Sequence, residues 1–289
     1  MLFHEISGKI YVWLKKQPNV KEESITDWLL FELSEKHKRI KYFAFTRNEE
    51  SVIGADWDWW ILTDTNAYRF RVQTKKLRPD IDNWFLISYS NKHGTQIDLF
   101  HESAKRDSAY PLYMFYSSTM PNINEQFGAF QNDIFYEMIK WCTDCDCGGF
   151  LSPAENIYQV VFGHQKKIIT DEFILNASLK LSSFDYFLKC NSEKCINKYL
   201  ELLNSKYIIS KGCKRNYGFR YEYKKPWTNT CSDKTIPDWL DSLIRDNNSF
   251  EESQIPKWFE IEFRRQLPDV LGFAILDLRK NENNDINYK

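Results

Sequence analysis

The segment from Tyr68 to Lys76, YRFRVQTKK, constrains the fold more than any other part of the chain. Side chains of a β-strand point alternately to its two faces. Tyr68, Phe70 and Val72 therefore share an apolar face. The opposite face carries three cations and one carboxamide, on Arg69, Arg71, Gln73 and Lys75. This pattern predicts a strand that packs one face against a hydrophobic core and presents polar side chains on the other.

A second strand is predicted directly before it, over residues 56–63, and the intervening sequence DTNA has the composition of a hairpin turn. Asp56 and Asp58 share one face of this strand. If the two strands pair as a hairpin, these aspartates lie beside Gln73 and Lys75. Two neighbouring carboxylates on an interior strand are costly unless a cation accompanies them.

The order of the predicted elements indicates an α/β fold. An amphipathic helix over residues 22–35 begins with a capping box, Ser24 and Asp27. It is followed by strands at 42–46, 56–63 and 68–76, a further short strand at 84–90, a helix at 95–107 and a strand at 111–117. A strand, a helix and a strand in succession predict a mixed sheet with at least one parallel pair, flanked by helices.

We expect residues 1–120 to form this core. Residues 121–289 would form a C-terminal α+β elaboration, either separate or part of the same domain. The pattern there predicts helices at 132–141 and 236–246 and a strand at 272–278.

The polar face of the hairpin has the donors of a magnesium site. Mg²⁺ prefers oxygen ligands, often one or two carboxylates with water and substrate phosphate. Asp56 offers a carboxylate and Gln73 a carbonyl oxygen, and a bound Mg²⁺ or Mn²⁺ would polarise a phosphodiester. Lys75 would orient the attacking water or stabilise negative charge on the phosphate. Arg69 and Arg71 would hold backbone phosphates. The alternative is an ordinary strand with solvated charges.

These residues resemble the PD-(D/E)XK nuclease superfamily, whose restriction-endonuclease-like core has the order helix, three strands, helix, strand (αβββαβ). The resemblance covers about the first 120 residues. It implies a helix acid at Glu23, or at Glu22, and a strand acid at Asp56 in the sequence GAD. The triplet QTK, residues 73–75, is similar to the Q-x-K variant of Mrr-type enzymes. Gln96, which opens the next helix, corresponds to a polar active-site position in some relatives.

Gln73 stands where most relatives have an acid, so the site has one negative charge fewer. Asp58 is expected to compensate, because it shares a face with Asp56. Glu50 is a further nearby acid, for which we favour an ordinary loop charge over a role in the site.

The wider pattern, EESITDWLLFEL with GADWDWW, VQTKK and PLYMFY, resembles a prokaryotic family of uncharacterised proteins with this fold. The resemblance implies a metal-dependent nuclease acting on DNA, in anti-phage defence, as a homodimer or with a defence-system partner. The alternatives are a catalytically inactive nucleic-acid-binding module of the same fold and an unrelated interaction protein.

Charge and cysteine content add limited information. The net charge of −1 provides no global attraction to nucleic acid, so contacts would be local. The basic run at 36–41, with Lys38 and Arg39, is either a DNA-backbone contact beside the site or a solvated helix end. Cys142, Cys145 and Cys147 resemble part of a zinc site, but we favour free thiols. No secretion signal or membrane span is evident in the sequence, so we expect a cytoplasmic protein.

Overall fold

The computed structural model describes residues 1–44, 55–64, 66–78, 83–92, 94–119, 146–163, 171–176, 178–189, 196–197, 199–200, 232–233, 240 and 272–279. The helices in these residues are α1 (Leu2–Lys16), α2 (Glu22–Lys36), α3 (Trp84–Ile87), α4 (Gln96–Arg106), α6 (Ala154–Gly163), α7 (Asp171–Asn176), the 3₁₀ helix η2 (Leu181–Phe184) and α8 (Asp185–Lys189). The strands are β1 (Ile40–Ala44), β2 (Trp57–Leu62), β3 (Ala67–Lys76), β4 (Ser90–Asn91), β5 (Gly94–Thr95), β6 (Tyr110–Tyr116), β7 (Gly149–Pro153), β8 (Leu179–Lys180), β9 (Ser232–Asp233) and β10 (Gly272–Asp277).

One mixed sheet organises the fold, with the strand order β1-β10-β2-β3-β6-β7-β8 and β9 paired to β3. β2 and β3 form the predicted antiparallel hairpin, closed by a hydrogen bond from Thr63 N to Asn66 O of 2.9 Å. β3 and β6 are parallel and are connected through α4. The predicted α/β class and the predicted parallel pair are therefore confirmed.

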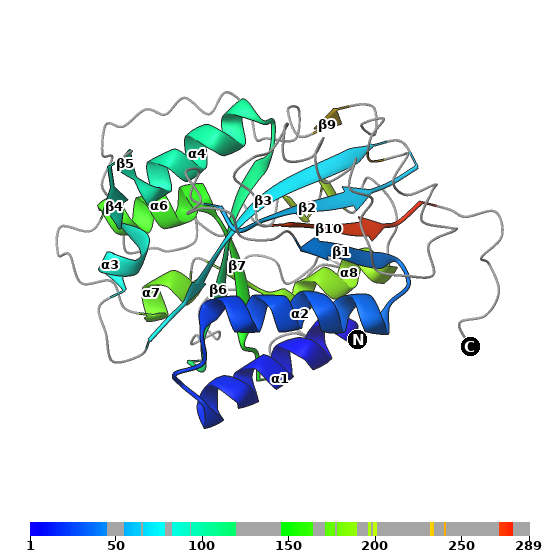
Figure 1. Cartoon of the computed structure of the whole chain (residues 1–289), viewed down its shortest axis with the longest axis horizontal. Helices are drawn as coiled ribbons and strands as arrows, with labels where there is room; N and C mark the ends of the chain where they lie inside the picture. The colour runs from blue at the N-terminus through cyan, green and yellow to red at the C-terminus, as the bar shows by residue number, and fades with distance from the viewer. Residues whose placement is uncertain are drawn as a thin grey trace, which may run out of the picture.

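Two hydrophobic layers enclose the sheet. α1 and α2 cover one face, and α4 and α6 lie on the other (Figure 1). The first layer receives Trp57 and Trp59 from β2, with the β3 side chains Tyr68, Phe70 and Val72. This sorting agrees with the alternation of the sequence, because neighbouring strand residues project to opposite faces.

Most predicted core elements exist close to their predicted boundaries, including those of α2, the hairpin, α4 and β6. The strand predicted at 84–90 is wrong, because Trp84–Ile87 form a short helix and only Ser90 belongs to a strand. The predicted capping box is also wrong. α2 begins at Glu22 with Lys21 as its N-cap, so Ser24 lies inside the first turn.

Two parts of the architecture were not predicted from the sequence. α1 lies within residues 1–120, where no helix was predicted before residue 22, and packs on α2 and η2. β10 inserts between β1 and β2, antiparallel to the first and parallel to the second. The predicted strand at 272–278 thus exists and joins the same sheet as the N-terminal strands. The helices predicted at 132–141 and 236–246 lie outside the described residues, except for Leu240.

The first turn of α1 is held by a carboxylate far along the chain. Asp185 accepts hydrogen bonds from Phe3 N (3.0 Å) and His4 N (2.9 Å). The first four N–H groups of a helix have no partner within the helix, and a carboxylate satisfies them while complementing the helix dipole. Asp185 therefore fixes α1 against η2 and α8.

We expect Asp185→Ala to lower the free energy of unfolding by about 1–2 kcal/mol, because it leaves two helix N–H groups without an acceptor. Chemical denaturation monitored by tryptophan fluorescence measures this loss. Glu35→Ala, which removes an exposed carboxylate of α2, is the control and should change stability by less than about 0.5 kcal/mol. Equal effects of the two substitutions would contradict the capping role.

Candidate functional site

The start of β2 and the end of β3 bring Asp56 and Gln73 together. One carboxylate oxygen of Asp56, Oδ2, accepts hydrogen bonds from Gln73 Nε2 (2.8 Å), Thr74 N (2.8 Å) and Thr74 Oγ1 (2.7 Å). Asp56 N in turn donates to Val72 O at 2.9 Å, which extends the hairpin by one residue. The hairpin thus fixes this carboxylate against β3.

The first residue of α2 brings a second carboxylate to the end of β3. Glu22 Oε2 accepts a hydrogen bond from Lys76 N. The first turn of α2 is fixed to the sheet by Thr26, whose hydroxyl donates to Glu22 O (3.2 Å) and is hydrogen-bonded to Tyr116 OH (3.0 Å). Glu22 is therefore held in place from both the helix and the sheet.

Lys76 also fixes the loop that leads into α2. Its ammonium donates to Pro18 O (2.7 Å) and Val20 O (2.6 Å), and the residue is 9% exposed. Sequence reasoning did not identify this role. The only signal was that Lys76 falls on the face of β3 opposite to Lys75, toward the helix.

The two carboxyl groups are held in an environment that disfavours their charge. The pKa of Glu22 is raised to about 7, chiefly by burial and also by the negative charge of Asp56, while the ammonium of Lys75 opposes the shift. Burial likewise raises the pKa of Asp56, against the opposing attraction of Lys75 and the hydrogen bonds of Thr74. The ammonium of Lys75 thus acts on both carboxyl groups, and a further cation between them would stabilise their ionised forms.

The unused oxygen atoms of the site suit a hard cation. Within the described residues, each carboxylate uses one oxygen for its hydrogen bonds, which leaves Glu22 Oε1 and Asp56 Oδ1 available. Across the same residues, no group of three or more His, Cys, Asp or Glu side chains is placed to hold a metal. Two carboxylates with a carboxamide therefore fit Mg²⁺ or Mn²⁺, which retain water ligands, better than a metal that needs a closed protein cage.

Gln96 and Tyr113 extend the site toward α4. Gln96 Nε2 lies 3.4 Å from Gln73 Oε1, and Tyr113 is the register partner of Gln73 on β6. Among the described residues, the buried atoms Gln96 Oε1 and Tyr113 OH have no hydrogen-bond partner. Buried polar atoms are normally satisfied, so a group outside the chain or a rearrangement within it is expected to satisfy them.

Glu22, rather than Glu23, is the carboxylate of the first turn of α2 that lies at the end of β3. Glu23 is exposed on α2, although its negative charge contributes to the raised pKa of both Glu22 and Asp56. The sequence assigned the helix acid to Glu23 first and to Glu22 as the alternative. The one-residue difference arises because the position along the helix determines which side chain faces β3.

Asp58 does not supply the compensating negative charge that was expected of it, because two arginines neutralise its carboxylate. Asp58 is 0% exposed and receives hydrogen bonds from Arg69 Nε (2.8 Å) and Arg71 Nε (3.0 Å). Burial alone would raise the pKa of Asp58, but the charges and hydrogen bonds of the two arginines outweigh it and lower the pKa. The cations that accompany this second aspartate are protein side chains rather than a metal.

The predicted phosphate contacts of Arg69 and Arg71 are also corrected. Arg71 is 0% exposed, and its Nη1 donates to Asp107 Oδ2 at 2.7 Å. Arg69 donates to Asp58 and to Asp107 O (2.9 Å), so both guanidinium groups are neutralised inside the fold. Lys21 and Arg78 are exposed cations nearer to Glu22 and Asp56. Lys21 directly precedes Glu22, and the charge of Arg78 adds to burial in lowering the pKa of Lys76.

The remaining predicted residues lie away from the site or outside the described residues. Lys38 and Arg39 follow the C-terminal end of α2, whereas Glu22 is at its start, and a helix of 15 residues is about 22 Å long. They are therefore not beside the site. Glu50, Cys142 and Cys145 are outside the described residues. Cys147 is buried, and its thiol is hydrogen-bonded to Ser7 Oγ (2.9 Å) and Gly149 O (3.0 Å).

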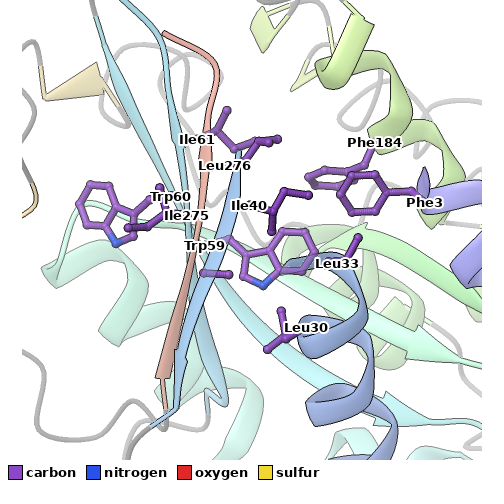
Figure 2. A pocket seen from close by; sticks show the side chains of 11 residues that line it. Phe3, Leu30, Leu33, Ile40, Trp59, Trp60, Ile61, Phe184, Ile275 and Leu276 are labelled. Carbon is purple, nitrogen blue, oxygen red and sulfur yellow. The ribbon is translucent and has the colours of Figure 1, made fainter. Parts of the chain in front are cut away.

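An apolar pocket of the hydrophobic core is separate from this constellation. Leu30, Leu33 and Phe184 line it on the helix side, facing Trp59 of β2 (Figure 2). Trp60, the next residue of β2, lies on the other side of the strands, as alternation requires. The lining includes no carboxylate, so the pocket offers no ligand for a cation.

The raised pKa of Glu22 predicts a pH-dependent stability in the absence of metal. Below pH 4.5 the carboxyl is protonated in both the folded and the unfolded state. Between pH 4.5 and about 7 the folded state retains a proton that the unfolded state releases, so stability falls as pH rises. Above pH 7 the free energy of unfolding stays lower than at pH 4.5 by roughly 3 kcal/mol.

Glu22→Gln keeps an acceptor for Lys76 N and removes the ionisation. We expect the variant in EDTA to be more stable than the wild type at pH 8 and similar at pH 4.5. Chemical denaturation across this range measures the difference. Parallel stability curves for the two proteins would show that Glu22 does not titrate abnormally.

The fold and the site define a class: an α/β protein with a mixed sheet, at whose β2–β3 hairpin two carboxyl groups, a carboxamide and a lysine converge. The family model described as a family of unknown function (DUF6615) matches residues 1–160. The match covers more than half of the 289 residues and includes every residue of the constellation, and the chain belongs to this family. No curated protein matches the chain. None of the described helices is long and apolar enough to cross a bilayer.

Proposed function

We propose that this protein is a metal-dependent nuclease that hydrolyses phosphodiester bonds of DNA, built on a restriction-endonuclease-like core. The observation that carries the proposal is the convergence of Glu22, Asp56, Gln73 and Lys75 at one end of the β2–β3 hairpin. The order α2, β1, β2, β3, α4, β6, with β2–β3 antiparallel and β3–β6 parallel, supports the same fold.

The residues divide the chemistry among them. Glu22 and Asp56 would hold Mg²⁺ or Mn²⁺ through their free oxygen atoms, with Gln73 as a neutral oxygen donor. The bound ion would polarise the phosphate and lower the pKa of a water molecule. Lys75, which makes no ion pair within the described residues, is available to orient the attacking water or to stabilise charge on the phosphate oxygens. Lys21 and Arg78 would contact the flanking phosphates.

The test is cleavage of supercoiled plasmid by the purified full-length protein with Mg²⁺ or Mn²⁺. We expect nicking with either metal, none in EDTA, and none with Asp56→Asn. Activity that persists in EDTA, or equal activity of the variant, would refute the proposal. If a bacterial host carrying the gene is protected against phage, and the Asp56→Asn gene gives no protection, the proposed defence role is supported as well.

One observation favours the second candidate, an inactive nucleic-acid-binding module of the same fold. Gln73 donates one N–H to Asp56 Oδ2 and the other to Thr74 O, so the amide, and not its oxygen, faces the carboxylate. For such a module we expect DNA retardation in a mobility-shift assay without cleavage under any divalent metal. A partner protein or a second copy of the chain would then be needed for a biological effect.

A further inference from the structure

The carboxamide of Gln73 is oriented for a site without a cation. Its Nε2 donates to Asp56 Oδ2 (2.8 Å) and to Thr74 O (3.0 Å), so both N–H groups are used on one side. Its Oε1 faces the other way, toward Gln96 Nε2 at 3.4 Å. This orientation places the positive end of the amide dipole beside the carboxylate, where a bound cation would be repelled by it.

Gln96 holds an unused acceptor at the same place. Its contact with Gln73 is long for a hydrogen bond, since the common N···O distance is about 2.9–3.0 Å. Its own Oε1 is buried and has no partner in the described residues. A buried acceptor without a hydrogen-bond partner destabilises the arrangement that contains it. Gln73 and Gln96 therefore share only one long hydrogen bond in the orientation that suits a site without a cation.

We propose that the carboxamides of Gln73 and Gln96 turn over together when a divalent cation binds at Asp56, with Gln96 as the positioning residue for Gln73. In the turned arrangement Gln73 Oε1 faces Asp56 and the cation, and Gln73 N–H donates to Gln96 Oε1. The acceptor that is now unsatisfied gains its hydrogen bond only in the metal-bound state. The inference rests on the proposed metal site and explains how glutamine serves at this position of β3.

The charge balance of the site supports this pairing. Gln73 is 2% exposed, so a glutamate there would place a third buried carboxylate beside Asp56 and Glu22, whose pKa values are already raised by burial. An amide avoids that repulsion because it can present either a donor or an acceptor. Gln96 can complement both orientations, since it too carries a donor and an acceptor.

The test is a double-mutant cycle on metal affinity, measured with Ca²⁺ and Mn²⁺ by isothermal titration calorimetry on the full-length protein. We expect Gln96→Met to weaken binding about 3- to 10-fold, the worth of one hydrogen bond. In a Gln73→Met background the second substitution, Gln96→Met, should have no further effect, because the two side chains act as a pair. Thermal unfolding in EDTA checks that each variant folds, and Gln96→Ala replaces Gln96→Met if it does not.

A control on the exposed face of α4, Glu102→Gln, should leave the affinity unchanged. Nuclear magnetic resonance provides a second readout: the side-chain amide signals of Gln73 and Gln96 should both shift on Ca²⁺ addition in the wild type. An unchanged affinity in Gln96→Met, or additive effects of the two substitutions, would overturn the inference. If Asp56→Asn still abolishes binding in that case, the proposed metal site stands without it. If the wild type binds neither metal, the proposed function fails first.

Discussion

Replacing Lys75 with methionine is expected to lower the rate of plasmid cleavage by a factor of about 10²–10³, the usual cost of removing one group that stabilises transition-state charge. Lys75 has no ion-pair partner among the described residues, and its charge acts on both Glu22 and Asp56. Methionine keeps a similar length and flexibility but removes the ammonium. We therefore expect the fold to be maintained, with a loss of about 1 kcal/mol or less in unfolding free energy from the missing attraction to the two carboxyl groups.

The adjacent residue provides a matched control. Lys76 projects to the opposite face of β3 and binds Pro18 O and Val20 O. Lys76→Met is expected to lower stability by about 1–2 kcal/mol, because two carbonyls lose their donor, with a smaller effect on the rate than Lys75→Met. Initial rates with Mg²⁺, together with chemical denaturation, separate the two effects. A Lys75→Met protein that cuts as fast as the wild type would remove lysine from the proposed chemistry.

The second large effect is expected from Asp58→Asn, which should destabilise the fold by about 3–5 kcal/mol. Asp58 and Arg71 are both 0% exposed, and Asp58 also accepts from Arg69, at 2.8 Å from Nε and 2.5 Å from Nη2. The neutral side chain would leave two guanidinium groups with Asp107 as their one charged acceptor among the described residues. Removing one member of a buried charge network costs more than the network contributes as a whole.

Asp56→Asn is the control for this substitution, two residues earlier on the same side of the hairpin. Its carboxyl has a raised pKa rather than a lowered one, so its loss should change stability by less than about 1 kcal/mol while it abolishes metal binding. Urea denaturation at pH 7 measures both variants. Equal stability of the two would contradict the division between a structural and a functional aspartate.

Acid adds an independent check on Asp58. Its pKa is lowered in the folded state, so its stabilising contribution is present above pH 3.8 and is lost as pH falls through the folded-state value. Glu22 has the opposite dependence, with stability lost as pH rises toward 7. The two carboxyl groups therefore limit stability from opposite ends of the pH scale.

The sequence determined the parts of this protein that follow from local pattern. Alternation in residues 68–76 predicted which side chains of β3 form its apolar face, which α1 and α2 cover. The turn sequence DTNA predicted the hairpin, and the order of elements predicted a parallel pair, which is β3–β6. The same alternation correctly placed Asp56 on the face of Gln73, with which it forms a hydrogen bond. These properties depend on residues a few positions apart in the chain, so the sequence alone predicts them.

Only the tertiary structure decided what each charge does. Strand alternation places Asp56 and Asp58 on the same face. Asp56 nevertheless binds Gln73 and Thr74, whereas Asp58 binds two arginines. The packing of α2 on the sheet turned Glu22 rather than Glu23 toward β3, and β10 entered the sheet from more than 200 residues along the chain. The charged and hydrogen-bonding partners of these carboxyl groups come from distant segments of the chain. The direction and size of each pKa shift depend on which partners contact the carboxyl group and on how completely it is shielded from water.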